Sequence, residues 1–144
     1  MVLKDFGEGF PDQAEMSAVD LVLYFSEEAE DTGQQLQEVL INALPEIWLE
    51  LFRGFDELVT GLRRPEVEPA LVVLVVVHRL ELEQFLPLRP VLENSKVFLV
   101  LPEDSGEIKD LAQRLSPFYM CSASDDFVEL ASIIDEILKE RRIS

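Results

Sequence analysis

Short apolar runs alternate along most of this chain with stretches in which apolar residues recur every three or four positions. Runs rich in β-branched and aromatic residues predict five strands, at 19–25, 47–52, 70–77, 96–101 and 118–122. Helical apolar spacing between them predicts helices at about 31–44, 55–62, 80–92, 108–115 and 125–139. Regular alternation of strand and helix predicts an α/β domain with a parallel sheet, because parallel strands need long crossovers.

The third run, ALVVLVVV at 70–77, has apolar side chains at every position. Such a strand is covered on both faces, as in the middle of a parallel sheet. Right-handed crossovers then place helices on both faces of a doubly wound five-stranded sheet, for which we expect the strand order 2-1-3-4-5. In that order, the first and last helices share one face, and the other three helices cover the opposite face.

Some helix ends can be predicted from local patterns. Thr32 with Gln35, and Asp104 with Glu107, have the spacing of a capping box. Two prolines inside 80–92 are expected to break that helix.

Residues 1–17 show no sustained period and are predicted to form an N-terminal arm, with one domain over 18–144. No apolar run approaches the roughly 20 residues that cross a bilayer, and the start lacks a secretory pattern. The lone Cys121 is expected to be a buried, reduced thiol, which fits the cytoplasm.

The chain is strongly acidic, with 12 Lys and Arg against 29 Asp and Glu and a formal net charge of −17. Proteins that bind nucleic acids neutralise phosphates with Lys and Arg. The field of this chain would repel DNA, RNA and anionic lipid surfaces. We therefore expect neither nucleic acid nor a membrane among its partners.

The order and lengths of the elements, together with the continuous apolar third strand, resemble the receiver domain of bacterial response regulators, over about 19–138. The resemblance implies a flavodoxin-like doubly wound domain that acts in two-component signal transduction. It also implies an aspartate that accepts a phosphoryl group beside a magnesium ion, with a hydroxyl residue after strand four and a lysine after strand five.

This chain departs from that pattern at each position. Strand three runs into His78 without a carboxylate at its tip, and strand four runs into Pro102. Strand five ends at Cys121-Ser122, where a receiver has Lys-Pro. Glu27 and Glu28 follow strand one and are at best a displaced remnant of the metal-binding pair. The sequence therefore resembles a degenerate, or pseudo-, receiver.

Ligands of such sheets bind beyond the carboxyl ends of strands one and three, where the connections diverge. The candidate residues of this switch-point cleft are Ser26, Glu27, Glu28, His78 and Arg79. We expect His78 or Arg79 to pair with Glu27 or Glu28; alternatively, all are solvated loop residues. His78 has no partner at catalytic spacing.

Other carboxylates are expected at the same edge of the sheet, where they either form an acidic rim for a cation or basic partner, or cap helix N-termini. These are Glu27, Glu28, Asp31, Glu103, Asp104, Asp125 and Asp126. A flavodoxin would need a phosphate-binding loop after strand one, and three glutamates within 27–30 would repel that phosphate. No dinucleotide, P-loop, zinc-protease or CxxC motif is present.

The sequence thus predicts a non-phosphorylatable, receiver-like protein-interaction and signalling module without enzymatic activity, catalytic residues, cofactor or metal. The partner would be another protein or a second copy of the chain, bound on the face of Tyr119 and the last helix. The alternative is a flavodoxin-like or other small-molecule-binding protein that uses the switch-point cleft. Glu81 is an acid that could fold back toward the end of strand three and reverse the prediction if it held a divalent ion.

Overall fold

The computed structural model describes residues 19–64, 69–102 and 106–143, and the predicted arm at 1–17 lies outside these ranges. The five strands are β1 (Leu21–Tyr24), β2 (Leu49–Phe52), β3 (Leu71–Val75), β4 (Lys96–Leu101) and β5 (Tyr119–Ser122). They form one parallel sheet in the order β2-β1-β3-β4-β5, as predicted. The hydrogen-bonded strands are mostly one to three residues shorter than the apolar runs, because the ends of the runs lie in the adjoining loops.

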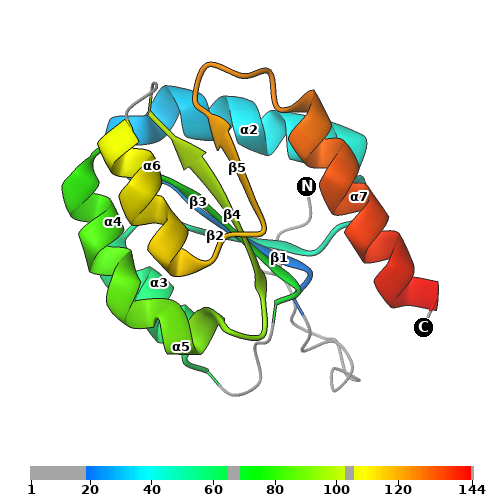
Figure 1. Ribbon diagram of the computed structural model, residues 1–144. Coiled ribbons are helices and arrows are strands. Elements are labelled where there is room, and N and C mark those ends of the chain that lie inside the picture. Colours follow the sequence, from blue (N-terminus) through cyan, green and yellow to red (C-terminus); the bar gives the residue numbers. More distant parts are fainter. Residues whose placement is uncertain (1–18, 65–68, 103–105, 144) are drawn as a thin grey trace.

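The helices cover both faces of this sheet (Figure 1). They are η2 (Glu27–Ala29), α2 (Glu30–Ala43), α3 (Phe55–Leu62), α4 (Arg79–Phe85), η3 (Leu86–Leu88), α5 (Arg89–Leu92), α6 (Gly106–Ala112), η4 (Gln113–Leu115) and α7 (Val128–Ile143), where η marks a 3-10 helix. Two apolar clusters form the core. One lies between the sheet and α2 with α7, and the other lies between the sheet and α3, α4 and α6. The predicted division of the helices between the faces is therefore confirmed.

The central strands explain why this arrangement is stable. Every residue of β1 and β3 is buried, so both strands contribute side chains to both clusters. Burial of each such side chain stabilises the fold by about 1.5–3 kcal/mol. The edge strand β5 differs, since all four of its residues are only partly buried.

One predicted detail of the helices was wrong and another was confirmed. The capping box at Thr32 does not form, because the chain enters α2 through the 3-10 turn η2 and the helix already begins at Glu30, without a side-chain cap. Pro87 and Pro90 break the segment 80–92 as predicted, into α4, η3 and α5. Pro87 lies in the first turn of η3 and Pro90 in the first turn of α5. The N–H groups of a first turn have no partner within the helix, so the N–H that proline lacks costs no helical hydrogen bond.

Other differences concern the ends and the burial of elements. The last helix begins at Val128 rather than near 125, after Phe127, whose φ of 64° is left-handed. Cys121 is half-buried rather than buried. The second capping box includes Asp104, which lies outside the described residues. No helix in the described ranges is long and apolar enough to cross a membrane.

Candidate functional site

The predicted switch-point cleft lies beyond the carboxyl ends of β1 and β3, where α2 and α4 leave toward opposite faces of the sheet. The structure brings His78 and Glu28 together, with 3.3 Å between His78 Nε2 and Glu28 Oε1. Both side chains are about half exposed or more, so this contact contributes little to stability. The pairing expected from the sequence is thus present for the histidine.

Arg79 does not join that pair. Its guanidinium lies 3.1 Å from Glu83 on the same helix and 3.6 Å from Glu107 at the start of α6. The Arg79 side chain therefore connects α4 with α6, and its charge is directed away from the end of β1. Of the remaining predicted residues, Glu27 is exposed in η2, while the Ser26 hydroxyl is buried and makes no hydrogen bond within the described part of the chain.

Glu81 is the buried charged residue of the described structure, with 7% of its surface exposed. Its Oε1 accepts a hydrogen bond of 2.7 Å from the backbone N–H of Val77, just beyond β3. The carboxylate also accepts a hydrogen bond from the Tyr24 hydroxyl at the end of β1. Glu81 thus folds back onto the switch point, and it binds two protein donors there.

The pKa of Tyr24 is raised to about 12. Burial is the main cause, since it disfavours the phenolate. The charge of Glu81 and its hydrogen bond add to the effect, and the positive charge of Arg53 opposes it. At neutral pH, Tyr24 is therefore a stable donor to Glu81.

Arg53, which follows β2 directly, was missed by the sequence analysis. Its Nε donates a 2.9 Å hydrogen bond to the carbonyl of Phe25, its guanidinium lies 4.4 Å from the centre of the Phe25 ring, and it pairs with Glu30. Its position next to a strand predicted to neighbour strand one was a usable signal, because both strand ends reach the same edge.

The arrangement does not fit a magnesium site. Mg²⁺ requires several oxygen ligands in octahedral geometry. Within the ranges that the structure describes, no three His, Cys, Asp or Glu side chains gather closely enough to hold a metal ion. Glu81 also faces hydrogen-bond donors, which cannot ligate a cation, so we derive no chemistry through a metal here.

The second predicted face surrounds Tyr119 on β5. Its side chain lies on the α7 side of the sheet, with its ring centre 5.7 Å from that of Phe98. Burial raises the pKa of Tyr119, and the charge and hydrogen bond of Glu129 on α7 add to this. Tyr119 is thus held to the last helix by a hydrogen bond rather than projecting freely.

A hollow lies on each side of β5. The hollow toward α6, of about 400 Å³, is lined largely by apolar residues that include Leu101, Ile108 and Met120. The hollow toward α7, of about 420 Å³, is lined by Tyr119 and Cys121 and by three carboxylates. The lining carboxylates are Asp125, Asp126 and Glu129.

Two of the carboxylates predicted at this edge have structural contacts. Asp125 accepts a 3.0 Å hydrogen bond from the N–H of Ser122, and Asp126 accepts one of 3.1 Å from the N–H of Val128. Both carboxylates are exposed. They therefore organise the turn before α7 and also contribute negative potential beside β5.

No family model matches this chain, and no curated protein matches it in sequence. Among solved structures, it is similar to the crystal structure of a response regulator from Thermotoga maritima. The match covers 84% of this chain and 98% of that chain, with a TM-score of 0.57 and 13% sequence identity. The likeness is one of fold. The chain has the receiver-like doubly wound fold that the sequence predicted.

Proposed function

We propose that this chain is a receiver-like protein-interaction module that does not accept a phosphoryl group. The observation that carries the proposal is the end of β3. The chain leaves this strand as Val76-Val77-His78, without an acceptor carboxylate. The nearby acid, Glu81, accepts hydrogen bonds from Val77 and Tyr24, so its oxygens are committed to protein donors.

The charges around this point support the same view. Glu28 pairs with His78, Glu30 pairs with Arg53, and Arg79 pairs with Glu83 and Glu107. A receiver needs its carboxylates free for a cation and a cationic side chain free for the phosphoryl oxygens. Here the opposite charges pair with one another, which favours a module that binds other proteins over one that accepts a phosphoryl group. A lone cysteine and an acidic surface fit a cytoplasmic location.

Acetyl phosphate with Mg²⁺, followed by intact-mass measurement, tests the proposal directly. An active receiver domain treated in the same tube is the control for the reagent. We expect no added phosphoryl mass on this chain under conditions that phosphorylate the control. A phosphorylated species of this chain would refute the proposal, and peptide mapping would identify the acceptor.

A second test asks whether Glu81 closes the site. If Glu81→Leu, which cannot accept these hydrogen bonds, also remains unmodified, the missing acceptor rather than the hydrogen bonds of Glu81 explains the inactivity. A phosphorylated Glu81→Leu variant beside an unmodified parent would show that an acceptor is present and that Glu81 blocks it.

A further inference from the structure

We propose that β5 binds an extended peptide segment as an additional strand, and that this segment alternates basic and apolar side chains. The proposal rests on the proposed function, since it names the partner of that interaction module. It follows from three independent features of the edge: its backbone, the two hollows beside it, and the distribution of charge.

The backbone of β5 has hydrogen-bonding groups that point away from the rest of the sheet, with no strand of the described residues beyond them. Phe118 donates its N–H to the carbonyl of Val97 on β4, at 2.7 Å. Because N–H and C=O groups alternate sides along a strand, those of Tyr119 and Cys121 point away from β4. β5 is the last strand of the sheet, and Figure 1 shows it between α6 and α7. The outward groups therefore face an open edge.

Proteins protect such edges with charged residues, proline or bulges. The other edge strand, β2, has a charged residue, Glu50, which pairs with Arg64 at 3.2 Å. By contrast, β5 reads Tyr-Met-Cys-Ser and carries neither a charge nor a proline. The edge at β5 is thus the one suited to strand addition.

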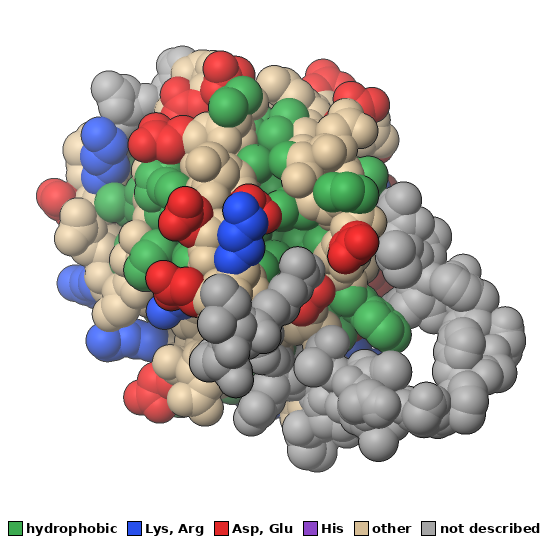
Figure 2. All heavy atoms as spheres, turned by 90° about the vertical axis from the view of Figure 1, so that its right-hand side faces the viewer, with side chains coloured by type: hydrophobic (Ala, Val, Ile, Leu, Met, Phe, Trp, Pro, Cys, Tyr) green, Lys and Arg blue, Asp and Glu red, His purple; other side chains and the backbone are tan. Residues whose placement is uncertain are grey.

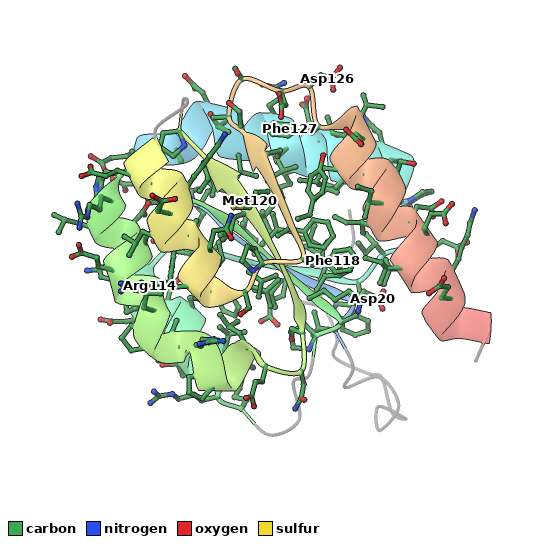
Figure 3. All side chains as sticks on the ribbon, viewed as in Figure 1. Asp20, Arg114, Phe118, Met120, Asp126 and Phe127 are labelled. Carbon is green, nitrogen blue, oxygen red and sulfur yellow. The ribbon has the colours of Figure 1, made fainter. Side chains whose placement is uncertain are left out.

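The two hollows give side-chain specificity. Met120 packs with the cluster on the α6 side, while Tyr119 and Cys121 pack on the α7 side. Figure 3 shows Met120 toward α6 and Phe127 toward α7. An added strand continues the same alternation, so its side chains enter the two hollows in turn. Since only two residues offer outward backbone groups, these side chains must supply much of the affinity.

The charges select the chemistry of the partner. Asp125, Asp126 and Glu129 line the α7 hollow, and no Lys or Arg is among its lining residues. The same negative potential is felt by Cys121, whose pKa is raised to about 12 by burial first and then by Asp125 and Glu129. Basic side chains fit this hollow, whereas the α6 hollow is mostly apolar, with Lys109 as its basic residue.

A second copy of the chain fits this edge poorly. Its own β5 would bring three further carboxylates against these three, within a molecule of net charge −17. Figure 2 shows acidic side chains, with hydrophobic ones between them, across the side of the molecule to which α7 belongs. The charge therefore favours a basic partner over self-association.

The test uses the peptide Lys-Val-Lys-Val-Lys-Val-Lys, blocked at both ends, and the full chain at about 0.15 M salt, where distant charges are screened. Binding is measured by calorimetry and located by amide hydrogen exchange. We expect the amides of Tyr119 and Cys121 to gain protection. The equally charged Lys-Pro-Lys-Pro-Lys-Pro-Lys lacks the backbone N–H at its three prolines and should bind more weakly, as should the Glu-Val counterpart.

The triple variant Asp125→Asn, Asp126→Asn, Glu129→Gln keeps the hydrogen-bond acceptors and removes the charges. It should bind the Lys-Val peptide about tenfold more weakly, as expected for three exposed ion pairs. The matched control removes three exposed charges elsewhere, Glu38→Gln, Glu46→Gln and Glu57→Gln, and should bind like the parent.

Equal binding of the Lys-Val and Lys-Pro peptides, no binding at all, equal losses in both triple variants, or protection at other residues would overturn the proposal. So would concentration-dependent self-association that protects Tyr119 and Cys121 without peptide. These outcomes concern the partner alone, because the phosphorylation assay tests the proposed lack of acceptor chemistry separately.

Discussion

Glu81→Gln removes the buried charge at the switch point and changes the size of the side chain very little. In the parent, Glu81 accepts hydrogen bonds from Val77 and Tyr24, and its charge and hydrogen bond help to raise the pKa of Tyr24 to about 12. The substitution removes the charge, keeps an amide oxygen that can accept the hydrogen bond, and leaves burial, the largest cause. We therefore expect the pKa of Tyr24 to fall in the variant and to remain above 10.

The same shift predicts how stability depends on pH. The folded pKa of Tyr24 lies above the unfolded value of 10, so the unfolded chain releases this proton first as the pH rises. The stability that the raised pKa of Tyr24 contributes to the folded state is fully present below pH 10 and is lost between pH 10 and 12. A shift of two units corresponds to about 2–3 kcal/mol. In Glu81→Gln, the loss over this range should be smaller.

Removing the acceptors should cost more than removing the charge. Glu81→Leu leaves the Val77 N–H and the hydroxyl of the buried Tyr24 without their acceptor. Each buried donor left unpaired costs about 1–3 kcal/mol. The free energy of unfolding should therefore fall by about 2–5 kcal/mol, and the melting temperature by on the order of 10 °C.

The titration is measured by absorbance at the phenolate band in a Tyr119→Phe background, where Tyr24 is the remaining one of two tyrosines. Unfolding in urea at pH 8 gives the stability. Glu83→Gln, on the exposed side of the same helix, is the matched control and should change neither quantity appreciably. Identical Tyr24 titrations in Glu81→Gln and the parent would refute the reasoning.

Two further predictions concern packing and the thiol. In Gly33→Ala, the new Cβ would lie 2.1 Å from the buried Phe25 ring. We therefore expect the free energy of unfolding, measured in urea, to fall by about 1–3 kcal/mol, against no more than about 0.5 kcal/mol for the exposed Glu38→Ala on the same helix. Equal values for the two variants would contradict the close approach. Cys121, with a pKa of about 12, should react with a disulfide reagent at pH 8 about a thousandfold more slowly than an unperturbed thiol. The double variant Asp125→Asn, Glu129→Gln should react faster than the parent. A parent rate like that of a free thiol would show that burial and these carboxylates do not raise the pKa of Cys121.

The sequence alone determined the fold class, the positions of the strands and the division of helices between the faces. These depend on local periodicity: a continuous apolar run such as 70–77 can be satisfied only by a strand covered on both sides. The absence of a carboxylate directly after β3 was also visible in the sequence, because the position is set by the end of one strand. The capping box at Thr32 failed because a preceding 3-10 turn competes for the same residues, which local spacing does not reveal.

Only the tertiary structure decided which charges meet. Arg53 and Glu30 are 23 residues apart in sequence, and Tyr24 meets Glu81 because β1 and β3 end side by side. The two hollows beside β5 likewise depend on where α6 and α7 lie relative to an edge that only sheet pairing defines. Periodicity determines whether a residue faces inward or outward, whereas the partner it meets depends on how separate elements pack, and that information is spread over the whole chain.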